Sequence, residues 1–403
     1  MASVPVHHAR LKRTAGSIAC GLAAALALAA CSSSPASKTT GTSGSTAPAG
    51  GSTSSTVAPQ ATSLSSILDS LEHAPSSGVS LTEDGSSLLY PLYQAWVSGY
   101  AKIHSNFSST SGADGSGTGI ADAESGTTVL GASDAYLPPG TTTQYPTIEN
   151  IPMAISAQMI NYNLPGMQNT HLKLNGTVLA GMYEGTIKNW DDPAIAKLNP
   201  SVRLPNLPVV PVHRSDSSGD TFLFSSYLAD SDPSSFAAKL GPSTSITFPS
   251  VSGALAAKGN SGMVATCGAT KGCVAYIGIS YKKDTTAAKL GEALLANKSG
   301  NYLLPNPSTI HAEAAGFTNV PANGAISLIY GSAAHGYPII NFEYLVVKTN
   351  QSNSTLAEGL KAFLAWCVDP RYGNAPSYLD QVGFQPLPSG ALSVSLALIK
   401  KIG

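Results

Sequence analysis

Three short segments of the chain combine Ser and Gly with acidic residues in a way that could bind an anion. They span residues 83–88, 114–119 and 214–221, and each stands directly before an apolar or helical stretch. At the start of a helix, Ser hydroxyls and unpaired backbone N–H groups stabilise negative charge. The alternative is that these segments are ordinary helix N-caps, since Ser and Asp are favoured there in any protein. None has the glycine spacing of a nucleotide-binding loop.

Two residues of the third segment favour the anion interpretation. Arg214 follows an apolar stretch, and its planar guanidinium can hold an oxyanion at two points. Asp216, two residues later, could orient that guanidinium by pairing with it.

Asp134 adds selectivity to this hypothesis, because it lies at the end of a predicted buried strand, residues 127–133. A carboxylate beside an anion is unfavourable unless it accepts a hydrogen bond from a proton on that anion. Phosphate keeps a proton at neutral pH and sulfate does not. The sequence therefore predicts a site that selects a protonated oxyanion.

The elements that must position these residues alternate between helices and strands. Leu88, Leu92, Trp96 and Tyr100 recur every four residues, which predicts an amphipathic helix. Pro91 fits best at its first position, so residues 86–88 fall in the loop before it. A second helix is predicted over residues 355–368. Apolar, β-branched and aromatic runs predict buried strands at residues 127–133, 152–157, 208–213, 272–279 and 338–347. This alternation predicts an α/β fold.

The composition excludes two classes of protein. Lys and Arg number 22 against 23 Asp and Glu, and charged residues make up 11% of the 403 residues, against ~25% in an average soluble domain. No basic stripe is present, so we expect no nucleic-acid partner. After residue 31 no apolar run approaches the ~20 residues that cross a bilayer, which argues against a polytopic membrane protein.

The first 31 residues resemble a bacterial lipoprotein signal. A basic region precedes the small, apolar stretch 14–30, which ends in Leu-Ala-Ala before Cys31. Lipid would be added to Cys31 after cleavage of residues 1–30; the alternative is an ordinary secretory signal with a coincidental Cys. Cleavage would remove three basic residues and no acidic one, so the formal net charge would fall from −1 to −4. Residues 32–63 are nearly all Ser, Thr, Gly, Ala and Pro, which predicts a tether.

The remaining cysteines fit an extracytoplasmic protein. Cys20 leaves with the signal, whereas Cys267 and Cys273 are spaced so that they can close a small disulfide loop in an oxidising compartment. A zinc site would need more ligands, and no His lies near them. Cys367 is expected to be a buried core thiol.

The segments GSSLLYPL, GSGTGI, GASDAYL and HRSDSSGDTF, in this order, resemble the substrate-binding lipoproteins of phosphate ABC transporters, especially the mycobacterial type. The similarity extends from about residue 81 to the C-terminus. It implies that donors to phosphate come from Ser86, Ser87, Leu88, Ser116, Ser218 and Gly219. It also implies that Asp134 accepts the phosphate proton, that Arg214 is the charged clamp held by Asp216, and that Asp220 is a second acceptor. More distant, enteric-type members have Thr at the position of Asp220.

The resemblance further implies a two-lobed α/β fold, the type II periplasmic-binding-protein architecture. The chain should cross between lobes near residues 155–160 and return near Pro338. We expect a signal at 1–30, the lipidated Cys and tether at 31–66, lobe I at 67–158, lobe II at 159–337, and the return to lobe I at 338–403. The implied function is capture of inorganic phosphate by a monomer anchored to the outer face of the cell membrane, and delivery to a permease, without a cofactor.

Two rival hypotheses come from other classes. A secreted phosphatase or serine hydrolase needs a base and usually a metal or an orienting acid. The six histidines after the signal are scattered, and no HExxH or GxSxG motif occurs. His213, beside Arg214, is expected to point away from the site. The third hypothesis, an adhesin or interaction module, would leave the converging donors and Asp134 unexplained.

Overall fold

A computed structural model describes residues 63–138 and 140–403. The expected signal, Cys31 and nearly all of the expected tether lie outside these residues. The described part begins with helix α1 (Leu64–Leu71), so folded structure starts inside the segment 31–66 that was assigned to the tether. The helix forms there because Ser63 caps it, accepting a hydrogen bond from Ser66 N at 3.2 Å, and because Leu68 is buried in the core.

The main sheet has nine strands, eight of them in the order β2-β1-β3-β12-β4-β8-β6-β7, with β9 paired to β4. On one side of β4, strands β1, β2 and β3 are parallel, and β12 is antiparallel to both β3 and β4. On the other side, β6, β7 and β8 are parallel and β8 is antiparallel to β4. The bounds are β1 (Val79–Gly85), β2 (Phe107–Ser111), β3 (Leu130–Ser133), β4 (Ile148–Tyr162), β6 (Val210–Arg214), β7 (Leu255–Ala257), β8 (Cys273–Gly278), β9 (Gly291–Glu292) and β12 (Ile340–Lys348).

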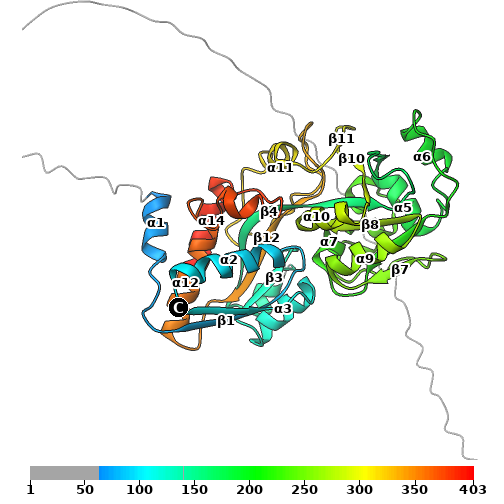
Figure 1. Ribbon diagram of the computed structural model, residues 1–403. Helices are drawn as coiled ribbons and strands as arrows, with labels where there is room; N and C mark the ends of the chain where they lie inside the picture. The colour runs from blue at the N-terminus through cyan, green and yellow to red at the C-terminus, as the bar shows by residue number, and fades with distance from the viewer. Residues whose placement is uncertain (1–62, 139) are drawn as a thin grey trace, which may run out of the picture. The chain divides into compact units, whose positions relative to one another are not determined.

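Strand β4 connects the two groups of strands. Its residues up to Ala157 pair with β12, and those from Gln158 onward pair with β8. Figure 1 shows β4 running from the group with β1 and β3 towards the group with β8. The strand is buried along almost its whole length, as expected for a strand covered on both faces. The change of partner falls within residues 155–160, where the resemblance places the crossing.

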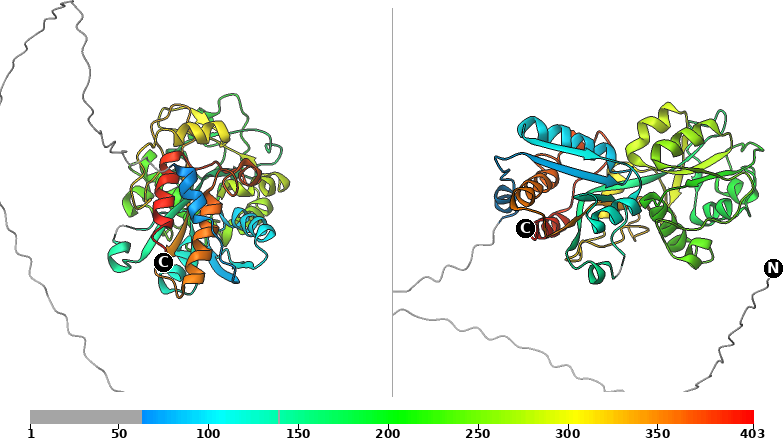
Figure 2. Two further views of the ribbon diagram at one scale, coloured as in Figure 1. Left: turned by 90° about the vertical axis from the view of Figure 1, so that its left-hand side faces the viewer. Right: turned by 90° about the horizontal axis from the view of Figure 1, so that it is seen from below.

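The helices that precede or cover the site are α2 (Tyr90–Ile103), α3 (Ser116–Ser125), α7 (Gly219–Ser231) and α9 (Gly259–Ala269). Helix α12 (Ser354–Val368) confirms the helix predicted there. Pro91 is the second residue of α2, one position later than predicted. In Figure 2, α1, α12 and α14 (Ser389–Ile399) lie together, and they contact one another.

The other helices are α4 (Thr141–Gln144), α5 (Gly176–Glu184), α6 (Pro193–Leu198), α8 (Phe236–Leu240), η1 (Ile279–Tyr281), α10 (Lys282–Ala287), α11 (Pro307–Ala314) and α13 (Pro376–Leu379). A small second sheet has the order β11 (Tyr302–Leu303), β10 (Leu294–Ala296), β5 (Lys173–Leu174).

The cysteines of the described region lie as the sequence predicts. Cys267, near the end of α9, and Cys273, the first residue of β8, form a disulfide. Cys367 is free and buried in α12. Across residues 63–138 and 140–403, no group of His, Cys, Asp and Glu is arranged to hold a metal ion. No helix in this same part of the chain is long and apolar enough to cross a membrane.

Candidate anion-binding site

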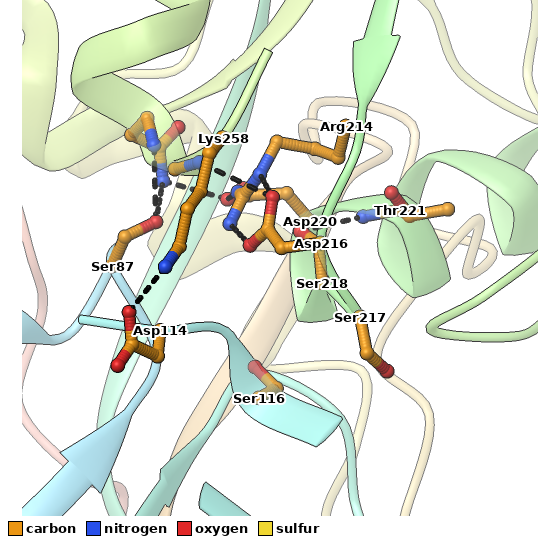
Figure 3. A network of polar contacts seen from close by, with 12 residues as sticks. Ser87, Asp114, Ser116, Arg214, Asp216, Ser217, Ser218, Asp220, Thr221 and Lys258 are labelled. Atoms are coloured by element: carbon orange, nitrogen blue, oxygen red, sulfur yellow. Dashed lines mark hydrogen bonds and ion pairs between the residues drawn. The ribbon is translucent and has the colours of Figure 1, made fainter. Parts of the chain in front are cut away.

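The three Ser-Gly segments found in the sequence meet in space with the start of a fourth helix. Gly117 N, in the first turn of α3, donates to Ser217 O, just before α7, at 2.9 Å. Asn260 N, in the first turn of α9, donates to Ser87 Oγ at 3.1 Å. In Figure 3, Ser87 and Ser116 come from the blue and cyan part of the chain and face Arg214 and Ser218 from the green part. The site therefore combines the starts of helices that belong to both groups of strands.

Asp134 directly follows β3 and is 2% exposed. Its Oδ1 accepts a hydrogen bond from the Ser86 hydroxyl, while its Oδ2 is buried and has no hydrogen-bond partner among the described residues. An unpartnered, buried carboxylate oxygen is costly, so its presence points to a function. It is an acceptor available to a proton-bearing group.

The surroundings of Asp134 make its carboxyl harder to ionise. Burial raises the pKa of Asp134 to about 7, and the negative charge of Asp220 adds to the rise. Hydrogen bonds from Ser86 and Glu343 and the positive charge of Arg214 act in the opposite direction.

Arg214 is held by two carboxylates. Its Nε donates to Asp216 Oδ1 at 2.8 Å, its Nη2 donates to Asp216 Oδ2, and its Nη1 donates to Asp220 Oδ2 at 2.7 Å. Only 1% of its side chain is exposed. Burial alone would lower its pKa, but the two carboxylates outweigh burial and raise it above the ordinary value, so Arg214 stays charged. The pairing of Arg214 with Asp216 is the one that the sequence suggests.

Asp220, expected to be a second acceptor for the ligand, accepts hydrogen bonds from protein groups in this structure. Its Oδ2 accepts from Arg214 and from Asn260 Nδ2, the latter at 2.6 Å, and its Oδ1 accepts from Gln158 Nε2 at 3.1 Å. The side chain is fully buried. Both oxygens therefore already have donors, and in this structure Asp220 supports Arg214. The sequence could not show this, because Gln158 and Asn260 are distant from Asp220 along the chain.

The remaining predicted residues lie at the starts of α2, α3 and α7. Ser218 caps α7 and accepts from Thr221 N at 3.3 Å. A Cβ at Gly219 would lie 2.4 Å from both Asp134 Oδ2 and Ser116 Oγ, so only Gly fits at this first position of α7. Ser116 Oγ accepts from Asp134 N at 3.1 Å.

At the start of α2, the predicted donor groups form hydrogen bonds with neighbouring protein groups. Leu88 N, an expected donor to the ligand, donates to Ser86 Oγ at 3.0 Å. Ser87 Oγ accepts from both the backbone and the side-chain nitrogen of Asn260. His213 stacks on Phe248.

Sequence reasoning missed Asn260, Lys258 and Glu343. Asn260 links Ser87 to Asp220 and also accepts from Gly278 N at 2.7 Å. Its signal was the Gly-Asn-Ser-Gly stretch before an apolar run, which resembles an ordinary cap. Lys258 and Asp114 form an exposed ion pair of 2.5 Å beside the site, visible in Figure 3. Glu343, on β12, lies beside Asp134 through the pairing of β12 with β3, and it has no sequence signal because it lies within an apolar strand.

Comparisons with known proteins show the family to which the chain belongs. The profile of the PBP superfamily domain matches residues 36–371. The phosphate-binding protein PstS of Methanocaldococcus jannaschii is 30% identical over 335 residues, which cover 78% of this chain and 84% of that protein. The phosphate-binding protein PstS 3 of Mycobacterium leprae is 29% identical over 294 residues, covering 68% and 74%.

Among solved structures, the phosphate-binding protein from Stenotrophomonas maltophilia is 21% identical, with a TM-score of 0.61, and the match covers 79% of this chain and 94% of that one. This likeness concerns the fold alone, and it confirms the predicted two-lobed α/β architecture. The chain is therefore a binding protein of the PBP superfamily. Within that superfamily it belongs to the PstS family of phosphate-binding proteins.

Proposed function

We propose that this protein captures inorganic phosphate outside the cytoplasmic membrane and delivers it to the permease of an ABC transporter. The observation that carries the proposal is the unpartnered, buried Oδ2 of Asp134, which faces the starts of α3 and α7 beside the charged Arg214. Membership of the PstS family supports it. The protein acts as a receptor and not as an enzyme.

The proposed chemistry combines many donors with one acceptor. Backbone N–H groups at helix starts, Ser hydroxyls and Arg214 would replace the water around the anion. Asp134 would accept the hydrogen bond from the oxygen that carries the proton. A fully deprotonated anion such as sulfate would leave that carboxylate unpaired, which costs on the order of several kcal/mol. We assign the donor role to Ser86, Ser87, Leu88, Ser116, Ser218 and Gly219, and a supporting role to Asp216 and Asp220.

Several of these donors now contact one another, so binding would exchange those contacts. The Ser86 hydroxyl, which donates to Asp134, would turn towards the anion. We propose that lobe I (67–158 and 338–403) and lobe II (159–337) separate around β4 and β12 to admit the ligand, as in other hinged binding proteins. A lipid on Cys31 would keep the receptor at the membrane that holds its permease.

Calorimetric titration of the purified Cys31→Ala protein with phosphate, arsenate and sulfate tests the proposal. We expect phosphate and arsenate to bind and sulfate to bind far more weakly, because arsenate also carries a proton at neutral pH. The proposal fails if phosphate does not bind or if sulfate binds equally well.

A further inference from the structure

A second carboxyl group lies directly behind the proposed proton acceptor. Glu343 is on β12, and the register that pairs Tyr344 with Ser133 brings Glu343 opposite Asp134. The two carboxyl groups are close enough that each changes the pKa of the other. Glu343 is 0% exposed and Asp134 is 2% exposed, so both are removed from water. Two carboxylates so close in a buried place cannot both be ionised, which means that the pair holds a proton.

The contacts of Glu343 show how its carboxyl is oriented. Its Oε1 accepts from Ser156 Oγ at 2.5 Å and from Asn341 Nδ2 at 3.1 Å. Its Oε2 has no donor among the described residues, and neither has Asp134 Oδ2. A buried carboxyl oxygen without a donor, beside a second carboxyl group, fits an O–H of its own. Because Oε1 already accepts from Asn341 Nδ2, the O–H belongs on Oε2.

The charges around the pair place this proton on Glu343. Arg214 acts on Asp134 and favours its ionised form, and the Ser86 hydroxyl also donates to Asp134. Burial raises the pKa of Glu343 well above its ordinary value, and the neighbouring charge of Asp134 raises it further. No cation is among the main causes that set the pKa of Glu343. The other ionisable groups that act on the pair are Asp220, on α7, and Tyr344, on β12.

We propose that Glu343 is a positioning residue for phosphate recognition: its protonated carboxyl donates a hydrogen bond to Asp134 and favours the ionised form of Asp134, the acceptor for the ligand's proton. This inference rests on the proposed function, and it adds a specificity determinant that acts through Asp134 without touching the ligand. Without the donor, Asp134 would take up a proton itself. A protonated Asp134 would offer a donor to the anion, and the site would then tolerate sulfate.

Two substitutions separate a proton donor from a charged or merely structural side chain. In Glu343→Gln the amide keeps a donor towards Asp134 and an acceptor for Ser156 and Asn341. Glu343→Met has a similar size and removes the donor. Glu313→Gln is the matched control, because Glu313 is another buried acid whose pKa burial raises to about 7, and it lies outside the site, beside Gly331.

The experiment titrates each variant in the full chain with phosphate and with sulfate by calorimetry, from mildly acidic to mildly alkaline pH. We expect Glu343→Gln and Glu313→Gln to keep the phosphate preference of the unsubstituted protein. Glu343→Met should lose about ten- to a hundredfold of that preference, the range for a charge-assisted hydrogen bond. Its sulfate binding should strengthen as pH falls. The inference is overturned if Glu343→Gln loses as much as Glu343→Met, or if Glu343→Met keeps the full preference.

A readout without ligand keeps this test independent of the proposed function. Infrared spectra of the unliganded protein at neutral pH should show the carbonyl band of a protonated carboxyl group that Glu343→Gln lacks and Glu313→Gln retains. Absence of that band refutes the inference even if phosphate binds. If the band is present and the unsubstituted protein binds no phosphate, the proposed function fails and the protonation of Glu343 stands. Thermal unfolding of each variant checks that it is folded.

Discussion

At the scale of single residues, the positive charge of Arg214 is already offset by carboxylates before an anion arrives. Arg214 is paired with both Asp216 and Asp220, and Asp134 lies nearby. The guanidinium therefore brings no surplus of positive charge to a ligand. The affinity must come from neutral donors, the Ser hydroxyls and backbone N–H groups, with Arg214 contributing direction as much as charge.

The raised pKa of Asp134 predicts a pH-dependent stability. Folding raises this pKa from its ordinary value near 4 to about 7, so between these pH values the folded chain holds more protons than the unfolded chain. The contribution of Asp134 to stability is therefore present below about pH 4 and is lost as pH rises to about 7. Asp134→Asn removes this pH-dependent contribution to stability. Its melting temperature relative to the unsubstituted protein should rise between these pH values, as measured by calorimetry without phosphate.

A difference in melting temperature that stays constant from about pH 4 to about pH 8 would contradict this argument. Asp380→Asn serves as the control, because Asp380 is exposed at the end of α13 and its substitution removes a carboxyl group outside the site.

At the scale of elements, the starts of helices define the site. The first residues of α3 and α7 approach so closely that Gly219 has no room for a side chain. Gly219→Ala should abolish detectable phosphate binding while the protein stays folded, because the added methyl group occupies the space beside Asp134 and Ser116. Gly262→Ala, within α9, is the matched control, since its new Cβ would lie 3.6 Å from Ala257 Cβ, an ordinary contact.

Calorimetry and thermal unfolding of both Gly variants check this prediction. Phosphate affinity within about threefold of the unsubstituted protein in Gly219→Ala, a difference below 1 kcal/mol, would show that α7 does not approach the ligand as proposed.

The elements also show what the sequence could and could not predict. Strands such as β8 and helix α12 were predicted because their apolar patterns are local. The full length of β4 was not predicted, since pairing depends on distant strands, and its change of partner near residues 155–160 was predicted from the family resemblance and not from a local pattern. Asp134 and Arg214 lie at the ends of strands, so the sequence alone could indicate that both belong to an anion-binding site. Gln158 and Glu343 lie inside apolar strands, where nothing local shows which side chain they meet.

At the scale of the whole molecule, the low charge has a mechanistic meaning. A chain with a formal net charge of −1, falling to −4 after the expected cleavage, has no broad field that attracts an anion. We therefore expect the contacts within the site to determine how the affinity for phosphate depends on salt. In place of a broad field, the protein uses local donors, which the sheet brings from both groups of strands to one buried place around β4.

The proposed anchor is tested on the whole molecule in cells. Cys31→Ala should move the protein from the membrane fraction to the soluble fraction, because the substitution removes the thiol that would carry the lipid. Immunoblots of fractionated cells measure this, and Cys367→Ala, which removes a buried thiol of α12, is the control that should stay with the membranes. Retention of Cys31→Ala in the membrane fraction would contradict the assignment.

The central claim is that Asp134 selects phosphate by accepting its proton. The most direct measurement compares the affinities of the unsubstituted protein and Asp134→Asn for phosphate, arsenate and sulfate by calorimetry at neutral pH. We predict that the preference for phosphate over sulfate falls by at least about tenfold in the variant, while arsenate continues to behave like phosphate. An unchanged preference for phosphate over sulfate would contradict the claim.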